Sequence, residues 1–224
     1  MKSEEGLVSQ PAESGEPVLV TKTWVYHFCQ KSTWLYGKIW HRMRVEGLEH
    51  LPREGGLVLA CNHQSFSDIL LLGGFVPRHV AFVARDTLAN WKWLGYTMRQ
   101  CGAVLVKRGS SDRKALRAMA EHLELGDCVI IFPEGTRTRD GKLGELKGGA
   151  LLAARMAQVP IVPVGIRGAY EAWPRGRYIP FPKKIALRFG APIDSSREDA
   201  QEQLVASMRA LIGDGTYKSL KPID

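Results

Sequence analysis

Short apolar runs alternate with longer mixed segments from residue 43 onward, and this pattern is the first guide to the fold. The apolar runs have the length of buried strands, and the segments between them are long enough for helices. The pattern predicts strands at residues 43–47, 57–61, 80–84, 103–107, 127–132, 161–166 and 184–189. It predicts helices at residues 67–74, 87–99, 112–125, 147–157 and 196–212. Such alternation predicts an α/β domain with a mixed, largely parallel sheet flanked by helices.

The N-terminal residues do not follow this alternation. Residues 1–17 are polar and rich in glutamate, and are predicted to be a disordered tail. Residues 18–42 interleave aromatic side chains with lysines and arginines, which predicts an amphipathic helical segment. Such a helix either lies in a membrane interface or covers the protein's own core, in which case Trp91 and Trp93 are the alternative membrane contact. No uncharged stretch approaches the ~20 residues that a membrane-spanning helix needs.

The charge and the cysteine content of the chain indicate which classes of partner and which compartment are expected. The 31 basic residues outnumber the 23 acidic ones and give a formal net charge of +8. This excess favours an anionic partner, such as anionic lipid, a phosphorylated substrate or nucleic acid. The four cysteines are widely spaced, and therefore indicate a reducing compartment rather than a disulfide framework or a zinc site. No set of His, Cys and Asp at ligand spacing occurs, so no metal site is predicted.

A polar cluster at residues 62–68 lies between two apolar runs and contains His63 and Asp68. These two residues are five apart, so a regular helix would turn them onto different faces. They can meet if His63 lies on the turn before a helix, with Ser65 as the N-cap and Asp68 in the first turn. Asp68 would then fix the tautomer of His63 and leave its other ring nitrogen as a general base. Because no Gly-x-Ser-x-Gly elbow is present, the base would act on a substrate hydroxyl.

An isolated His and Asp at this spacing are more often structural, but a second cluster changes the balance. Residues 132–137 read Phe-Pro-Glu-Gly-Thr-Arg, directly after an apolar run. Together the clusters resemble the glycerolipid acyltransferase family, in its 1-acylglycerol-3-phosphate acyltransferase (PlsC-type) branch. The family's His-x4-Asp motif matches His63 and Asp68, and its second motif matches residues 132–137 letter for letter. Weaker blocks match in the family's order at residues 104–108 and 159–164.

The resemblance implies an acyltransferase domain at residues 43–224 with His63 and Asp68 as its catalytic residues. It implies transfer of a fatty acyl group from acyl-CoA or acyl-carrier protein to the free hydroxyl of lysophosphatidic acid. The product would be phosphatidic acid, in phospholipid biosynthesis. No cofactor is implied beyond the thioester co-substrate. Because the acceptor is a lipid, we expect a peripheral enzyme on an anionic membrane surface, at the cytoplasmic face.

Basic residues recur at the ends of the predicted strands, where ligands of open α/β sheets bind. An anionic phosphate at this edge would be bound by several of them, and arginine suits bidentate binding of oxygens. By family resemblance, Glu134, Gly135, Thr136 and Arg137 help to bind the acceptor and its phosphate. Further candidates at the same edge are Arg85, Arg108 and Lys147.

The sequence is also compatible with other functions. The same motifs would suit another lysolipid or glycerol 3-phosphate as the acceptor. A non-catalytic membrane-binding domain is disfavoured because His63 and Asp68 are both intact. Nucleic-acid binding is disfavoured because no recognition helix, zinc finger or aromatic RNA-binding motif occurs. The oxyanion of the reaction needs donors, for which the helix-start amides near Ser65 are candidates.

Overall fold

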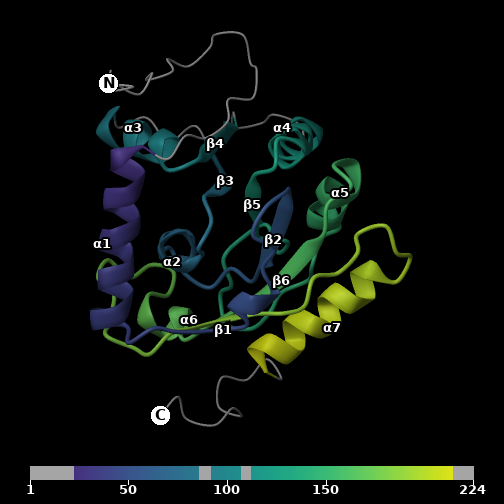
Figure 1. The fold of residues 1–224 in the computed structure, drawn as a ribbon. Helices are drawn as coiled ribbons and strands as arrows, with labels where there is room; N and C mark the ends of the chain where they lie inside the picture. The colour runs from purple at the N-terminus through teal and green to yellow at the C-terminus, as the bar shows by residue number, and fades with distance from the viewer. Residues whose placement is uncertain (1–22, 86–91, 107–111, 214–224) are drawn as a thin grey trace, which may run out of the picture.

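The computed structural model describes residues 23–85, 92–106 and 112–213. In this part of the chain one sheet has the strand order β1-β7-β6-β2-β5-β3-β4 (Figure 1). The strands are β1 (Arg44–Glu46), β2 (Leu57–Cys61), β3 (Val80–Arg85), β4 (Ala103–Val106), β5 (Cys128–Ile131), β6 (Ile161–Arg167) and β7 (Ala186–Phe189). β7 is antiparallel to β6 and β1 is parallel to β7, whereas the other neighbours are all parallel. The predicted mixed, largely parallel sheet is confirmed.

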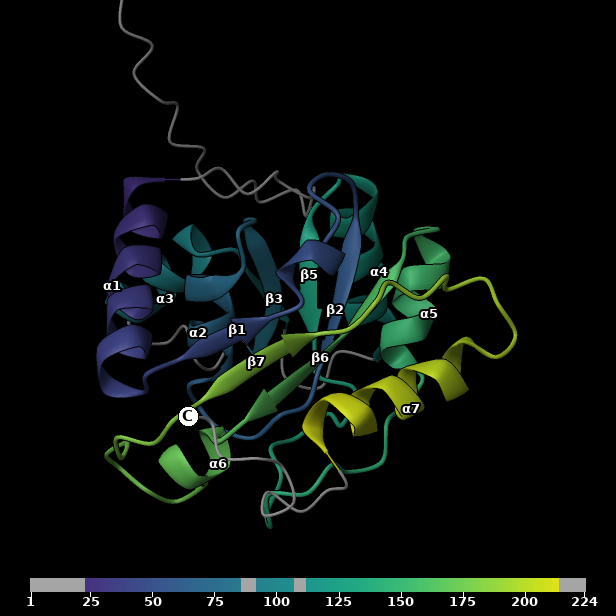
Figure 2. The same cartoon turned by 60° about the horizontal axis from the view of Figure 1, so that its bottom comes forward.

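Helices cover both faces of this sheet. They are α1 (Trp24–Trp40), α2 (Asp68–Phe75), α3 (Lys92–Gln100), α4 (Asp112–Glu124), α5 (Gly149–Met156), α6 (Ala169–Ala172) and α7 (Ala200–Ile212), with a 3-10 turn at Leu48–His50. The core on one face includes residues of α2 and α6, and the core on the other includes residues of α4, α5 and α7. Figure 2 shows α1 outside α2, as an additional layer.

The central strand β2 shows why the apolar runs predicted strands well. Leu57, Leu59 and Cys61 belong to the core on one face, and Val58 and Ala60 to the core on the other. All five residues are fully buried. A strand buried on both faces has no polar alternation, so it reads in the sequence as an uninterrupted apolar run.

Some predicted boundaries differ from the structure. The helix predicted at 196–212 begins only at Ala200, because Asp194 Oδ1 accepts hydrogen bonds from the backbone and hydroxyl of Ser196 and holds a turn there. The short helix α6 was not predicted. The predicted tail at 1–17 and the first residues of the helix predicted at 87–99 lie outside the described residues.

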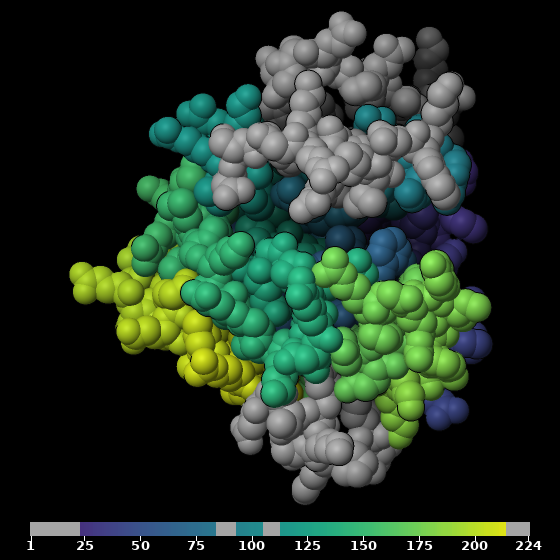
Figure 3. All heavy atoms as spheres, turned by 180° about the vertical axis from the view of Figure 1, so that it is seen from behind, coloured from purple at the N-terminus to yellow at the C-terminus, as the bar shows by residue number. Residues whose placement is uncertain are grey.

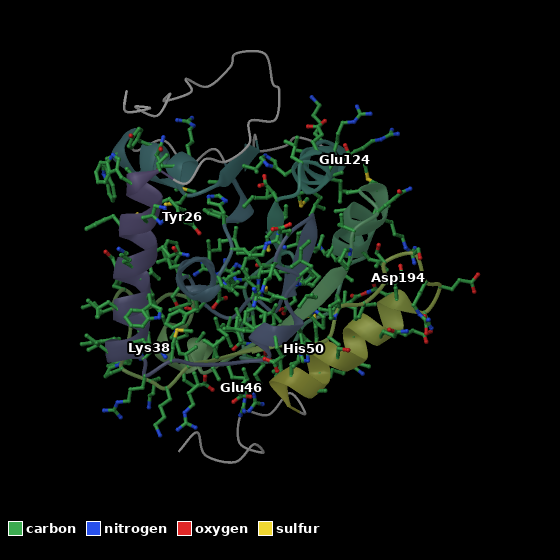
Figure 4. The ribbon with its side chains drawn as sticks, viewed as in Figure 1. Tyr26, Lys38, Glu46, His50, Glu124 and Asp194 are labelled. Carbon is green, nitrogen blue, oxygen red and sulfur yellow. The ribbon has the colours of Figure 1, made fainter. Side chains whose placement is uncertain are left out.

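α1 packs against α2 through two glycines. A Cβ atom on Gly74 would lie 3.1 Å from the Thr33 side chain, and one on Gly37 would lie 2.5 Å from the Phe75 ring. Only residues without a side chain allow the helices to approach this closely. Tyr26, labelled in Figure 4, is also buried on this side of α1. The predicted amphipathic helix is therefore confirmed, and this side of it packs on the protein's own core.

The opposite side of α1 is exposed and apolar. Its large exposed hydrophobic residues include Trp24, Phe28, Leu35 and Ile39. Among the described residues, none of the helices has both the length and the apolar character required to cross a bilayer. α1 thus has one face on the protein and one apolar face directed outward.

The sheet brings the two sequence motifs together. β2 lies between β5 and β6 and is parallel to both, with Ala60 opposite Ile131 at the end of the β5 pairing. His63 follows β2 and Glu134 follows β5, so the two motifs meet at the same edge of the sheet.

Candidate active site

Asn62 fixes the chain where it leaves β2. Its side-chain amide donates to the carbonyl of Ile166 at 2.9 Å, and its Oδ1 accepts from the Ile166 amide at 2.6 Å. These two hydrogen bonds extend the pairing of β2 with β6 by one residue, through a side chain instead of the backbone. Because Asn62 is fully buried, the next residue, His63, starts from a fixed position. No role was predicted for Asn62, although a polar residue directly after an apolar strand is a usable signal.

The predicted contact between His63 and Asp68 is confirmed. Asp68 Oδ2 lies 2.9 Å from His63 Nδ1 and accepts the backbone amides of Gln64 at 2.7 Å and Ser65 at 2.8 Å. A carboxylate oxygen that receives two amides is an acceptor, so Nδ1 of His63 carries the proton and donates. Nε2 then has a free lone pair, and the His63 side chain is 19% exposed.

Burial of Asp68 has an electrostatic cost. The residue is fully buried. Desolvation raises the pKa of its carboxyl group, and the hydrogen bonds from His63, Ser65 and Gln64 oppose this rise because they stabilise the ionised form. The turn thus holds a buried carboxylate against the imidazole.

One detail of the predicted turn is wrong. The helix begins at Asp68 with Ser67 before it, so Ser65 is not the N-cap. The hydroxyl of Ser65 instead accepts from the Ser67 amide at 3.1 Å, which closes a local turn ahead of the helix. The amides of Gln64 and Ser65 point to Asp68, because its carboxylate is the strongest acceptor within reach. These two amides are therefore engaged with the Asp68 carboxylate.

Glu134 joins the second motif to the first. Its Oε1 accepts the His63 backbone amide at 2.7 Å, and its Oε2 accepts the Gly144 amide at 2.8 Å. The carbonyl of His63 accepts from the Thr138 amide at 2.8 Å. Burial raises the pKa of Glu134, which is 8% exposed. Both carboxylate oxygens are therefore used within the protein, and the loop after β5 holds both backbone groups of His63.

One aromatic ring stacks on the imidazole, and two more lie against each other close to it in the fold. Phe132 stacks on His63 with 4.0 Å between the ring centroids and 19° between the planes. Phe66 is exposed; its ring lies 5.4 Å from that of Trp173 and 5.9 Å from the guanidinium of Arg137. No role was predicted for Phe66 or Trp173, since their contact depends on the tertiary structure.

The cations of the second motif lie at the same edge. Gly135 has φ +69° and is exposed beside Lys147, whose ammonium would lie 3.4 Å from a Cβ at Gly135. The backbone amide of Lys147 donates to the carbonyl of Pro133 at 3.0 Å. Thr136 is exposed and Arg137 is partly buried. The fold thus brings Gly135, Thr136, Arg137 and Lys147 together beside His63.

The remaining predicted cations cannot be placed at this site. Arg85 is the last residue of β3, two strands from β2, but its side chain lies outside the described part. Arg108 also lies outside it. Across the described ranges no three His, Cys, Asp or Glu residues lie together as metal ligands do.

A second His-Asp pair has the same spacing but a different setting. His122 Nδ1 lies 2.8 Å from Asp127 Oδ2, between the end of α4 and the start of β5. This is the opposite edge of the sheet, and a hollow of about 660 Å³ near Pro160 and Ser195 also lies toward that edge. The spacing alone therefore does not identify the active site. What distinguishes His63 is its bond to the loop after β5 and the cations of that loop.

The chain is similar to known acyltransferases. The model of the family described as "Acyltransferase" matches residues 42–167 of this chain. A 1-acyl-sn-glycerol-3-phosphate acyltransferase of Bacillus subtilis is 30% identical over 191 residues, which cover 84% of this chain and 93% of that protein. A lyso-ornithine lipid O-acyltransferase of Pseudomonas aeruginosa is 31% identical over 148 residues, 66% of this chain and 53% of that protein. The crystal structure of the 1-acyl-sn-glycerophosphate (LPA) acyltransferase PlsC from Thermotoga maritima superposes with a TM-score of 0.72, at 32% identity, over 84% of this chain and 79% of that one.

The hydrogen bonds by which Glu134 connects the two motifs can be tested with Glu134→Gln. Glutamine offers one acceptor oxygen where the structure needs two, and its NH2 group would face a backbone amide. We expect the free energy of unfolding to fall by about 1–3 kcal/mol, with faster hydrogen exchange at the amides of His63 and Gly144. Glu145→Gln, at an exposed neighbouring position, is the matched control and should change neither. Unchanged exchange at both amides in Glu134→Gln would contradict this role.

Proposed function

This chain belongs to the acyltransferase family, and from that premise we propose that it transfers a fatty acyl group from an acyl thioester to the free hydroxyl of lysophosphatidic acid. The product is phosphatidic acid, and the donor is acyl-CoA or acyl-carrier protein. The observation that carries the proposal is the partly exposed imidazole of His63, whose Nδ1 is held by buried Asp68.

The chemistry follows from the tautomer. Nε2 of His63 takes the proton from the acceptor hydroxyl as this oxygen attacks the thioester carbonyl. Asp68 stabilises the imidazolium that forms and keeps the ring oriented. When the tetrahedral intermediate collapses, the carbon–sulfur bond breaks and His63 returns the proton to the leaving thiolate. No covalent acyl-enzyme is required, because the nucleophile belongs to the acceptor.

The acceptor's phosphate is assigned to the loop after β5. Arg137 and Lys147 present cations on the same side as the imidazole, and exposed Gly135 permits close approach to the backbone. Arginine can bind two phosphate oxygens in parallel, which orients the acceptor as well as attracting it.

A second acceptor class is supported by one relative. The similar Pseudomonas aeruginosa protein carries the name lyso-ornithine lipid O-acyltransferase, so resemblance at this level extends to an acceptor of another kind. The purified protein should be incubated with both thioester donors and a panel of lysophosphatidic acid, other lysophospholipids, glycerol 3-phosphate and a lyso-ornithine lipid. Mass spectrometry of the lipids identifies the acceptor, and lysophosphatidic acid is expected to give the largest yield.

The enzyme is proposed to work as a peripheral protein on an anionic membrane surface, at the cytoplasmic face. Its acceptor and product are lipids, and the chain carries a net charge of +8. The outer face of α1 combines exposed apolar residues with Lys31, a composition that suits the headgroup region.

The general-base role is tested with His63→Ala and Asp68→Asn. Loss of the base should lower turnover by about 10²–10⁴-fold or more, with the fold intact. Asp68→Asn should also lower turnover strongly, because an amide cannot stabilise the imidazolium. His122→Ala removes a histidine from a pair of the same spacing at the other edge of the sheet, and should leave turnover by the folded protein near wild type. A well-folded His63→Ala protein with near-wild-type turnover would overturn the mechanism.

The phosphate assignment is tested with Arg137→Ala in steady-state kinetics. Loss of a charge-assisted hydrogen bond of roughly 1.5–3 kcal/mol should reduce the efficiency toward phosphorylated acceptors about tenfold to a hundredfold. The Michaelis constant for the thioester donor should change little, and Arg137→Lys should recover only part of the loss. An equal rise in the Michaelis constants of donor and acceptor would instead point to a structural role.

The membrane role of α1 is tested with the double variant Phe28→Ser and Ile39→Ser, since both residues lie on its exposed face. Deleting the helix would also strip its contacts from α2, so point changes are the cleaner experiment. Sedimentation with anionic liposomes should fall about tenfold or more, because burial of each apolar side chain is lost. Leu152→Ser with Met156→Ser, at exposed positions on α5, is the control. If both variants sediment like the wild type, the membrane contact is not on this face.

A further inference from the structure

The segment between α6 and β7, residues 173–184, is exposed and carries both apolar and basic side chains. We propose that this segment, called here the aromatic-basic loop, is a second contact with an anionic lipid bilayer, beside α1. The inference rests on the proposed function, because it identifies the surface from which the lipid acceptor reaches His63.

The exposed side chains of this loop have the composition of a membrane-interface segment. Tyr178 is 95% exposed, Ile179 is 74% exposed and Phe181 is 48% exposed. The loop also carries four cations and no acidic residue, namely Arg175, Arg177, Lys183 and Lys184. Apolar side chains flanked by cations match a surface with anionic headgroups above an apolar interior. Charge complementarity therefore favours anionic lipid over a second copy of this chain, whose net charge is also positive.

The loop is held in one conformation by its own contacts. The indole of Trp173 donates to the carbonyl of Arg177 at 2.8 Å, and the amide of Phe181 donates to the carbonyl of Ala172 at 2.8 Å. The Arg177 guanidinium lies 4.0 Å from the centroid of the Phe181 ring. Three prolines, at 174, 180 and 182, restrict the backbone further. The apolar side chains are thus presented outward by an ordered loop, which lowers the entropy lost on binding.

One end of the loop contacts the active site. Trp173 lies against Phe66, which belongs to the turn between His63 and Asp68. Tyr170, just before the loop, donates to the carbonyl of Arg139 at 2.8 Å. In Figure 3 the green segment around α6 lies beside the teal loop that follows β5. The loop is therefore joined to the same edge of the sheet as the imidazole.

The other end of the loop contacts α1. His41, which ends this helix, donates from Nδ1 to the carbonyl of Lys183 at 3.0 Å, and its own carbonyl accepts from the Ile185 amide at 3.1 Å. Figure 1 shows α3 at the N-terminal end of α1 and the segment after α6 at its C-terminal end. α3 also exposes Trp93 and Tyr96. The loop therefore connects the C-terminal end of α1 to the region of the active site.

The proposal is tested with the double variant Tyr178→Ser and Ile179→Ser in the full chain. Vesicles of phosphatidylcholine with phosphatidylglycerol are compared with vesicles of phosphatidylcholine alone. We expect partition onto the anionic vesicles to weaken about tenfold or more. Hydrogen exchange in residues 174–184 of the wild type should slow when anionic vesicles are added. The control is Leu152→Ser with Met156→Ser, which should bind as the wild type does.

The outcomes separate this proposal from the proposed function. Turnover of a short-chain acceptor dispersed as monomers should be unchanged in the loop variant, because neither residue belongs to the catalytic machinery. If the wild type acylates no acceptor, the vesicle measurements still report on the loop. Wild-type partition of the variant, with no vesicle-dependent change in exchange at 174–184, would overturn the proposal. So would a dimer in solution that depends on Tyr178 and Ile179.

Discussion

The buried carboxylate of Glu134 is the joint on which the active site depends. One oxygen holds the backbone of His63 and the other holds Gly144, so the loop after β5 and the turn after β2 form one unit. In a buried setting such bonds are strong, and loss of the carboxylate would remove the acceptor of the His63 amide. The position of His63 is therefore set twice, by Asn62 from the side of β6 and by Glu134 from the side of β5.

The turn between His63 and Asp68 lowers the stability of the fold, but it orients the imidazole for catalysis. Asp68 is fully buried, which raises its pKa, and among the described residues its Oδ1 has no hydrogen-bond partner. An apolar side chain at this position would avoid the free energy of desolvation that a buried carboxyl group requires. The same burial gives the imidazole a fixed tautomer and orientation, which a solvated pair would not hold. The pair of His122 and Asp127 has the same spacing and is also largely buried, but it connects the end of α4 to the start of β5, away from the loop that holds His63.

On the surface of the molecule, α1 likewise has one face that stabilises the fold and one apolar face that is exposed. α1 packs closely on α2 at two glycines, its Tyr26 ring lies against His79, and its large apolar residues are directed outward. The aromatic-basic loop is joined to this helix through His41 and to the active site through Trp173. A protein that acts on lipids needs an apolar outer surface next to its site, and the cost of exposing that surface to water is removed on a bilayer.

The sequence alone determined the strands, the fold class and the His63–Asp68 pair, because each is recorded in local periodicity or in a short motif. β2 was predicted at its observed bounds since a strand buried on both faces is apolar throughout. The start of α7 at Ala200 differs from the predicted start at residue 196, because the Asp194 side chain holds a turn where the apolar pattern still predicts a helix. The strand order, the bond from Glu134 to a residue 71 positions away, and the contact of Trp173 with Phe66 were decided only by the tertiary structure. Apolar periodicity reports that a segment is buried, whereas its neighbours depend on how distant segments pack, which no local pattern records.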